Sequence, residues 1–266
     1  MRAPRNAREL FGECFEDGPL RASATSTTKS ATQTTWVFGP HERWDADELG
    51  KTVVVRALEL NMSARANAAL VALALNERAN GRAMAVSNLG GAFHSVPDVF
   101  ERWKCAETEE LREAVEAALR DVECEFDKKK VMVKQCMGRG DGAKVSTSWV
   151  NVCDGVGEQG HGLHNHVNAV WSGVYYAATS ATDRDDEDEE DQPGDLLIRI
   201  TAGGFNPLAK PGENSGYFRY HRIAPKPSRL VIFPSWVYHG VLANDIGSSA
   251  PRVSFAFNSG ETGVSF

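Results

Sequence analysis

Two histidines in the segment HGLHNH are spaced so that both could bind one metal ion. His164 and His166 lie two residues apart, and side chains two apart on an extended chain point to the same face. Two imidazoles on one face can converge on a single ion. His161 lies three residues before His164, so an extended chain turns it to the other face, and we place it outside the site. The spacing predicts a metal site, against the simpler interpretation that these histidines cap a loop.

A third candidate ligand is His239, in the segment FPSWVYHGV. It follows a predicted strand and a Pro-Ser turn, and a histidine just past a strand can reach into the mouth of a β-barrel. A packed or solvated histidine is the simpler interpretation of His239 alone.

The segment RVSFAFN places an arginine and a serine on one face of a predicted strand. Arg252 and Ser254 alternate with an apolar face that carries Phe255 and Phe257. A guanidinium offers a fixed fork of donors that matches a carboxylate, and a neighbouring hydroxyl adds one donor more. The pair stands 13 residues after His239, where it could bind a carboxylate beside the metal. The alternative is an ordinary polar strand face in contact with solvent.

The elements around these residues indicate a mainly β protein with flanking helices. Short runs rich in Val, Ile and aromatics, separated by Gly, Pro and Asp, predict antiparallel strands in a sandwich or barrel. These runs are 145–152, 170–178, 195–200, 217–223, 229–234 and 252–258. Earlier in the chain we expect one helix from Ser63 to Asn80, ended by Gly81, and a second that buries Leu111, Val115, Ala118, Leu119 and Val122.

The length of 266 residues suits one catalytic domain with additions. Residues 1–35 are predicted to be a disordered tail, because positions 21–35 hold nine Ser or Thr. We expect a single domain over 36–266, with a helical part at 36–130 and a β core at about 131–266. The tail also carries four arginines, so a transit peptide is conceivable, although its acidic residues argue against one. The predicted location is cytoplasmic, or an organelle if the tail is a transit peptide.

Charge and cysteine content narrow the choice of partners. The run DRDDEDEED at 183–191 has eight acids and one Arg, so it alone accounts for the net charge of −7. We expect this run to be a solvated, mobile loop. The rest of the chain is neutral overall, so nucleic acid is a poor candidate partner. Five cysteines with no C-x-x-C pair favour a reducing compartment, and no apolar run approaches the roughly 20 residues that span a membrane.

The segments SNLGGAFHS (87–95), SWVN (148–151), HNHVNAVWSGVYY (164–176), LVIFPSWVYHGV (230–241) and RVSFAFN (252–258) together resemble the 2-oxoglutarate/Fe(II) oxygenase superfamily. More narrowly, they resemble a little-characterised group of oxygenases within it. The resemblance implies a double-stranded β-helix, also called a jelly-roll or cupin-like core. It also implies that His164, His166 and His239 bind iron, and that Arg252 and Ser254 bind the distal carboxylate of 2-oxoglutarate.

The chain departs from the superfamily pattern at the second ligand. The superfamily usually has H-x-D, whereas His166 stands here in place of the Asp. Three neutral imidazoles still bind Fe(II), but they leave the site one negative charge short. Asp154, Glu158 and Asp195 are alternatives that could supply a carboxylate. The narrower group also often has a proline where Val167 stands.

The resemblance implies a dioxygenase that uses Fe(II) and 2-oxoglutarate to oxidise, most simply to hydroxylate, a small-molecule or peptide substrate that the sequence does not identify. One alternative is a cupin-like protein that binds a metal or a carboxylate without oxidation, and another is an oxygen-independent metal enzyme. Four aromatic residues lie near the motifs and could line the cavity, although packing in the core is the commoner role. They are Trp149, Trp171, Tyr176 and Trp236.

Overall fold

The protein is described from a computed structural model. The described residues are 4–11, 20–21, 26–30, 32–38, 53–81, 83–84, 91–128, 143–154, 159–166, 169–179, 191–201, 218–243 and 250–260. Glu158, Val167 and the acidic run up to residue 190 lie outside them, so the expected mobile loop stays a prediction.

Both predicted helices are present. α2 (Ala64–Asn80) begins at Ser63, whose Oγ accepts from the backbone N–H of Ala66 at 3.0 Å. It ends at Gly81, which has a φ of 80° and donates its N–H to the carbonyl of Glu77. α4 (Ala106–Lys128) buries the five apolar residues that define its expected inner face. The shorter helices are α1 (Ala7–Phe11) and α3 (Val99–Arg102).

The strands form two sheets. The larger sheet has the order β2-β3-β4-β11-β8-β13-β6-β5, and the smaller has the order β1-β10-β9-β12-β7. The bounds in the larger sheet are β2 (Ser26–Lys29), β3 (Gln33–Phe38), β4 (Val53–Glu59), β5 (Phe93–His94), β6 (Val145–Cys153), β8 (Trp171–Ala178), β11 (Arg229–Pro234) and β13 (Arg252–Ser259). Those in the smaller are β1 (Leu20–Arg21), β7 (His161–His164), β9 (Leu196–Thr201), β10 (Phe218–Ile223) and β12 (His239–Val241).

The last eight strands follow the path of a double-stranded β-helix. From β6 to β13 the chain alternates between the two sheets, except at the hairpin from β9 to β10. The pairs β13–β6, β13–β8, β11–β8, β12–β7 and β12–β9 are all antiparallel. The expected mainly β class and jelly-roll core are therefore confirmed, and each of the six predicted strands is present.

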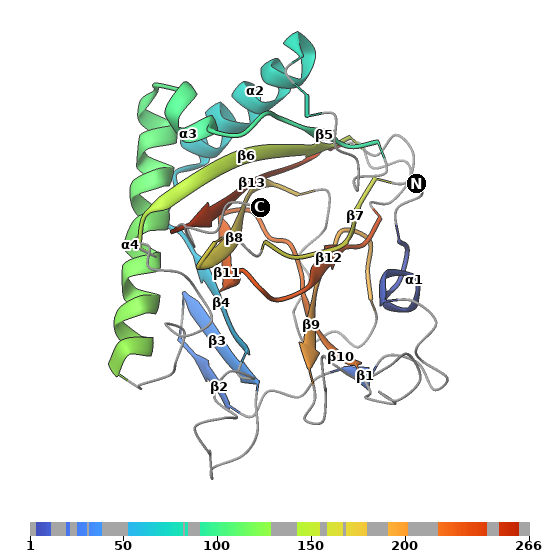
Figure 1. The fold of residues 1–266 in the computed structure, drawn as a ribbon. Helices are drawn as coiled ribbons and strands as arrows, with labels where there is room; N and C mark the ends of the chain where they lie inside the picture. The colour runs from blue at the N-terminus through green and yellow to red at the C-terminus, as the bar shows by residue number, and fades with distance from the viewer. Residues whose placement is uncertain are drawn as a thin grey trace.

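The helices cover the outer face of the larger sheet, as Figure 1 shows for α2 and α4 beside β6 and β13. One core cluster lies at this interface and includes Leu70, Leu119 and Phe255. A second includes Ile198 and Phe233 and lies between the two sheets. Because strand side chains alternate between faces, the residues of β13 next to Phe255 point to the space between the sheets.

Residues 1–35 were predicted to be a disordered tail, and the described part of this segment contains α1, β1, β2 and the start of β3. α1 buries Ala7 and Leu10 against the smaller sheet, and the carbonyl of Pro4 accepts from the N–H of Ala243. β3 begins at Gln33, runs past the end of the predicted tail and pairs with β4. The Ser/Thr-rich composition of this segment is compatible with edge strands, because Thr favours extended structure.

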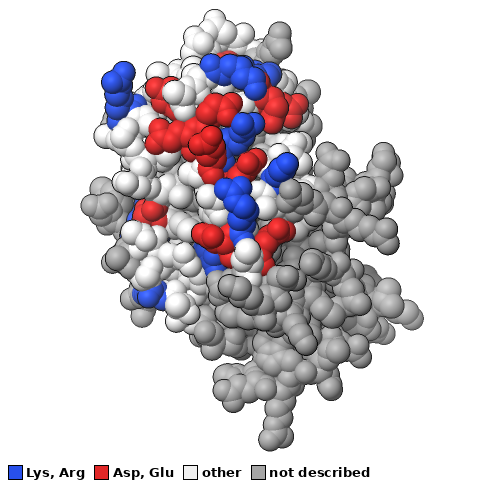
Figure 2. Space-filling view, turned by 90° about the vertical axis from the view of Figure 1, so that its left-hand side faces the viewer, with Lys and Arg blue, Asp and Glu red and all other residues white. Residues whose placement is uncertain are grey.

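Acidic and basic side chains are interspersed over the face that α4 presents in Figure 2. The described residues of this face form no large patch of a single charge. No helix in the described part of the chain is both long enough and apolar enough to cross a membrane.

Candidate metal centre

A cavity of about 220 Å³ lies between the two sheets of the β-helix. Its wall includes the five residues predicted to form the site: His164, His166, His239, Arg252 and Ser254. They come from β7, the turn after it, β12 and β13. The fold therefore brings into one cavity residues that are up to 90 positions apart in the sequence.

The three histidines meet on the smaller-sheet side of this cavity. His164 ends β7 and His239 begins β12, and the two are directly opposite in the antiparallel register. His166 follows β7, where its N–H donates to the carbonyl of Ser235 at 2.8 Å. One nitrogen from each of the three rings lies within 4.8 Å of the others, so they could hold one metal ion.

Hydrogen bonds fix which ring nitrogens face the metal position. The Nδ1 of His164 lies 2.8 Å from the carbonyl of Gly162, and the Nδ1 of His239 lies 3.0 Å from the carbonyl of Val237. A carbonyl only accepts, so each Nδ1 donates and each Nε2 keeps its lone pair for a metal. His166 is hydrogen-bonded to the side chain of Asn258, whose Oδ1 also accepts from Ser172.

Burial keeps these rings uncharged at neutral pH. Loss of solvent lowers the pKa of His166 to about 4, with a smaller contribution from the neighbouring His164. The same cause lowers the pKa of His164, and that of His239 well below its usual value. A neutral imidazole is the form that binds metal, so the donor set fits a divalent transition metal.

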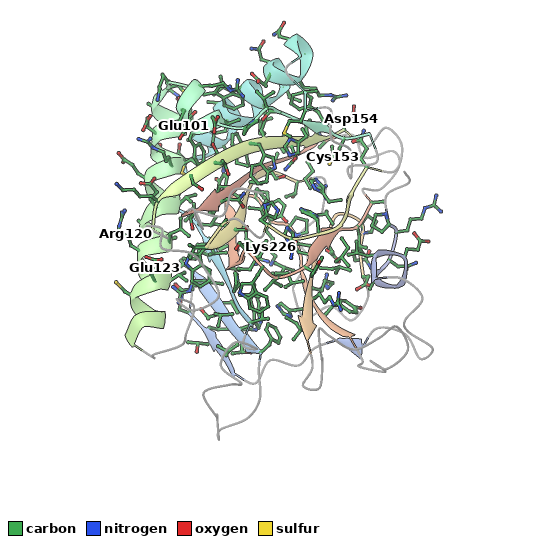
Figure 3. All side chains as sticks on the ribbon, in the orientation of Figure 1. Glu101, Arg120, Glu123, Cys153, Asp154 and Lys226 are labelled. Atoms are coloured by element: carbon green, nitrogen blue, oxygen red, sulfur yellow. The ribbon has the colours of Figure 1, made fainter. Side chains whose placement is uncertain are left out.

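Two carboxylates considered as alternative ligands are engaged elsewhere. Asp154 lies at the end of β6 (Figure 3), where it pairs with Arg78 and accepts from Gln159. Asp195 is fully buried and pairs with Arg222. Among the described residues, the cluster suited to a metal therefore consists of three imidazoles.

Arg252 and Ser254 lie on the larger-sheet side of the cavity, both nearly inaccessible to solvent. Arg252 donates from Nη1 to the carbonyl of Gly194 at 3.1 Å and from Nη2 to the Sγ of Cys153 at 3.0 Å. Neither partner is a carboxylate. Tyr176 lies opposite Ser254 in the β8–β13 register and lines the same cavity. Burial raises the pKa of Tyr176 to about 12, so its hydroxyl remains a neutral donor.

The cavity also contains His161, which the sequence spacing placed on the opposite face. The β12–β7 register explains the difference, because Val241 pairs with His161 and His239 pairs with His164. Three steps along β7 thus match two along β12, which is the signature of a β-bulge, and a bulge can turn a side chain to the other face. His161 lies outside the three-histidine cluster but lines the cavity.

Asn151 and His94 also line the cavity, and neither was predicted as a site residue, although both belong to segments that carry the family resemblance. The Oδ1 of Asn151 is buried and has no hydrogen-bond partner. Of the four aromatic candidates, Trp149 and Tyr176 line the cavity. Trp171 lies in the core and Trp236 packs against it.

Part of the chain is similar to a known protein family. Residues 147–258 match a family model described as "Putative 2OG-Fe(II) oxygenase". This stretch spans β6 to β13 and contains all five predicted site residues. No curated protein sequence matches the chain at a significant level.

Several solved structures are similar to this chain at low sequence identity. A Pseudomonas putida prolyl-4-hydroxylase has 14% identity and a TM-score of 0.45, over 77% of this chain and 91% of that one. The carbocyclase SnoK from nogalamycin biosynthesis has 10% identity and a TM-score of 0.48, over 78% and 79%. EctD from S. alaskensis with bound Fe has 15% identity and a TM-score of 0.41, over 97% and 87%.

Since these TM-scores are all below 0.5, the assignment rests on the family match and on the strand order. Residues 147–258 of the chain are therefore similar to the 2-oxoglutarate and Fe(II)-dependent oxygenases.

Proposed function

We propose that this protein hydroxylates a substrate with Fe(II) held by His164, His166 and His239, and with 2-oxoglutarate held by Arg252 and Ser254. The observation that carries the proposal is the position of Arg252. It is a buried guanidinium whose described partners are a carbonyl and a thiol sulfur, and it shares one cavity with the three imidazoles. A buried charge needs an opposite charge, and a dicarboxylate co-substrate supplies one.

The arrangement of the cavity wall suits a ligand with a carboxylate at one end. Arg252, Ser254 and the hydroxyl of Tyr176 are donors from neighbouring strands β13 and β8. The guanidinium keeps its orientation through its bonds to Gly194 and Cys153. Together these groups would bind and orient the distal carboxylate of 2-oxoglutarate, so that its 2-oxo acid end faces the histidines.

Fe(II) and 2-oxoglutarate, when bound, would supply the oxidative chemistry, in which dioxygen is reduced while 2-oxoglutarate is converted to succinate and carbon dioxide. The protein supplies orientation and a space that excludes water. Three neutral imidazoles do not compensate the positive charge of a divalent ion. This favours an anionic co-substrate beside the ion.

The inner part of the substrate is expected to be uncharged. Among the described residues that line the cavity, Arg252 is the one with a permanent charge. In this proposal its charge is used to bind the carboxylate of 2-oxoglutarate, not the substrate. The other lining groups are imidazoles, apolar and aromatic side chains, hydroxyls and the amide of Asn151. A neutral small molecule or peptide side chain fits this lining.

The direct test is conversion of 2-oxoglutarate to succinate by the purified Fe(II)-loaded protein without added substrate. We expect slow turnover that needs both Fe(II) and dioxygen and that is lost in His239→Ala. The alternative of a binding protein is supported by the metal cluster of the described residues, which consists of imidazoles alone. It predicts iron and 2-oxoglutarate binding with no succinate above the metal-free control.

A further inference from the structure

A column of aromatic rings runs from β5 to the metal cluster. The rings of His94 and Trp149 are stacked, with centroids 5.6 Å apart and planes inclined by 12°. Trp149 and His166 are stacked in the same way, at 5.5 Å and 9°. The next ring in line is His239, at 5.2 Å and 21° from His166. These separations lie in the range of favourable offset stacking.

The outer end of the column is held firmly by backbone structure. The Nδ1 of His94 lies 2.7 Å from the carbonyl of Ser95. Ser95 in turn makes two hydrogen bonds with Val150. Its N–H donates to the carbonyl of Val150, and its side-chain Oγ accepts from the N–H of Val150. His94 therefore has a fixed position from which to support Trp149, which lies next to Val150 on β6.

The inner end of the column is the ligand that departs from the H-x-D pattern. A carboxylate has two equivalent oxygens, whereas an imidazole must turn one particular nitrogen to the metal. His166 lies beyond the end of β7, so its ring is oriented by the hydrogen bond to the side chain of Asn258 and by its neighbours rather than by strand pairing. A parallel ring against its face opposes rotation about the Cβ–Cγ bond.

We propose that Trp149, supported by His94, positions the imidazole of His166 for metal binding. This inference rests on the proposed metal site. It gives a role to the SWVN and FHS segments, whose residues come from β6 and β5, outside the strands that carry the ligands.

The test is a titration of the metal-free protein with Co(II). Calorimetry measures the affinity, and visible absorption reports the coordination of the bound ion. Trp149→Leu keeps an apolar side chain but removes the stacked ring, and we expect Co(II) affinity to fall roughly 3- to 10-fold. Its Co(II) spectrum should also change, because the hydrogen bond to Asn258 then holds the ring of His166 without a stacked neighbour. Trp149→Phe retains a ring and should stay within about 2-fold of wild type.

The matched control is Trp103→Leu, because Trp103 packs against Phe255 in the core under the helices, on the other face of the sheet. It should lower the melting temperature but leave Co(II) affinity and spectrum unchanged. His94→Leu should weaken binding less than Trp149→Leu. In the double variant it should add nothing, because His94 acts through Trp149.

Two outcomes separate this inference from the proposed function. If wild type does not bind Co(II) stoichiometrically, the metal site itself is wrong. If wild type binds and Trp149→Leu matches it in affinity and spectrum, the site stands and the positioning role of Trp149 is wrong. A loss of affinity in Trp103→Leu equal to that in Trp149→Leu would also overturn the inference, because the effect would then be general destabilisation.

Discussion

Arg222 donates from Nη1 to the Oδ2 of Asp195 at 3.1 Å, and both side chains are almost completely buried. Asp195 also accepts from the backbone N–H of Gln192. The carboxylate thus has structural partners at the start of β9, although Asp195 was one of the three alternative carboxylate ligands considered from the sequence.

We therefore expect Asp195→Asn to affect stability rather than metal binding. The substitution removes the negative charge that faces the buried guanidinium of Arg222, and breaking a buried ion pair typically costs about 3–5 kcal/mol. Denaturant unfolding should show this loss, while the folded variant should keep a full equivalent of iron. Loss of iron from protein that is still folded would make Asp195 a ligand.

Alanine substitutions should separate the three proposed ligand histidines from His161, another histidine that lines the cavity. His164→Ala, His166→Ala and His239→Ala each remove one donor from the cluster. His161→Ala is the matched control, since His161 is a buried histidine in the same cavity but outside the cluster. Metal analysis after anaerobic loading should show iron lost from the first three and kept in His161→Ala. Stoichiometric iron in all three ligand variants would refute the assignment.

The metal-free protein should lose stability as the pH falls below about 6.5. Burial lowers the pKa of His166 to about 4 in the folded state, and those of His161 and His239 well below the ordinary value. Between about pH 6.5 and 4 the unfolded chain therefore binds protons that the folded chain does not, and this favours unfolding. The free energy of unfolding should fall by up to about 1.4 kcal/mol per pH unit for each such histidine.

Denaturant unfolding at pH 5, 6, 7 and 8 in the presence of a chelator checks this expectation, with His166→Gln expected to give a shallower decline. The same stability at pH 5 and pH 8 would contradict burial of these rings in the neutral form.

Asn151 lies directly opposite Ser254 in the β6–β13 register, and both line the cavity. Asn151→Asp keeps the size of the side chain but adds a negative charge near the expected co-substrate dianion. At the effective dielectric of such sites this costs about 1–2 kcal/mol, or roughly a 5- to 30-fold loss in 2-oxoglutarate affinity at pH 8. The uncharged Asn151→Leu should lose less. Equal affinity in Asn151→Asp and wild type would place the co-substrate away from β6.

The sequence predicted much of the fold because its strands are rich in β-branched and aromatic residues, as in RLVIFP and RVSFAFN. β7 was missed because its sequence, HGLH, is short and contains no Val, Ile, Thr, Phe, Tyr or Trp. β4 was missed although its valines at 53–55 are a clear strand signal. The position of His161 depends on a bulge, and the role of Asn151 depends on the pairing of β6 with β13. Neither feature can be predicted from local sequence, because each is set by the register between distant strands.

The measurement that tests the central claim most directly is calorimetric titration of 2-oxoglutarate into the anaerobic Mn(II)-loaded protein. Wild type should bind one equivalent, and omission of the metal should weaken binding. Arg252→Ala leaves a carboxylate of the co-substrate unpaired in the cavity, at an expected cost of about 2–5 kcal/mol, which is a loss of roughly 30-fold or more.

Arg252→Lys should restore only part of this affinity, because an ammonium cannot make the paired contact of a guanidinium. Metal content should be unchanged in both variants, since Arg252 is not a ligand. Equal affinity for 2-oxoglutarate in wild type, Arg252→Ala and Arg252→Lys would contradict the proposed co-substrate site.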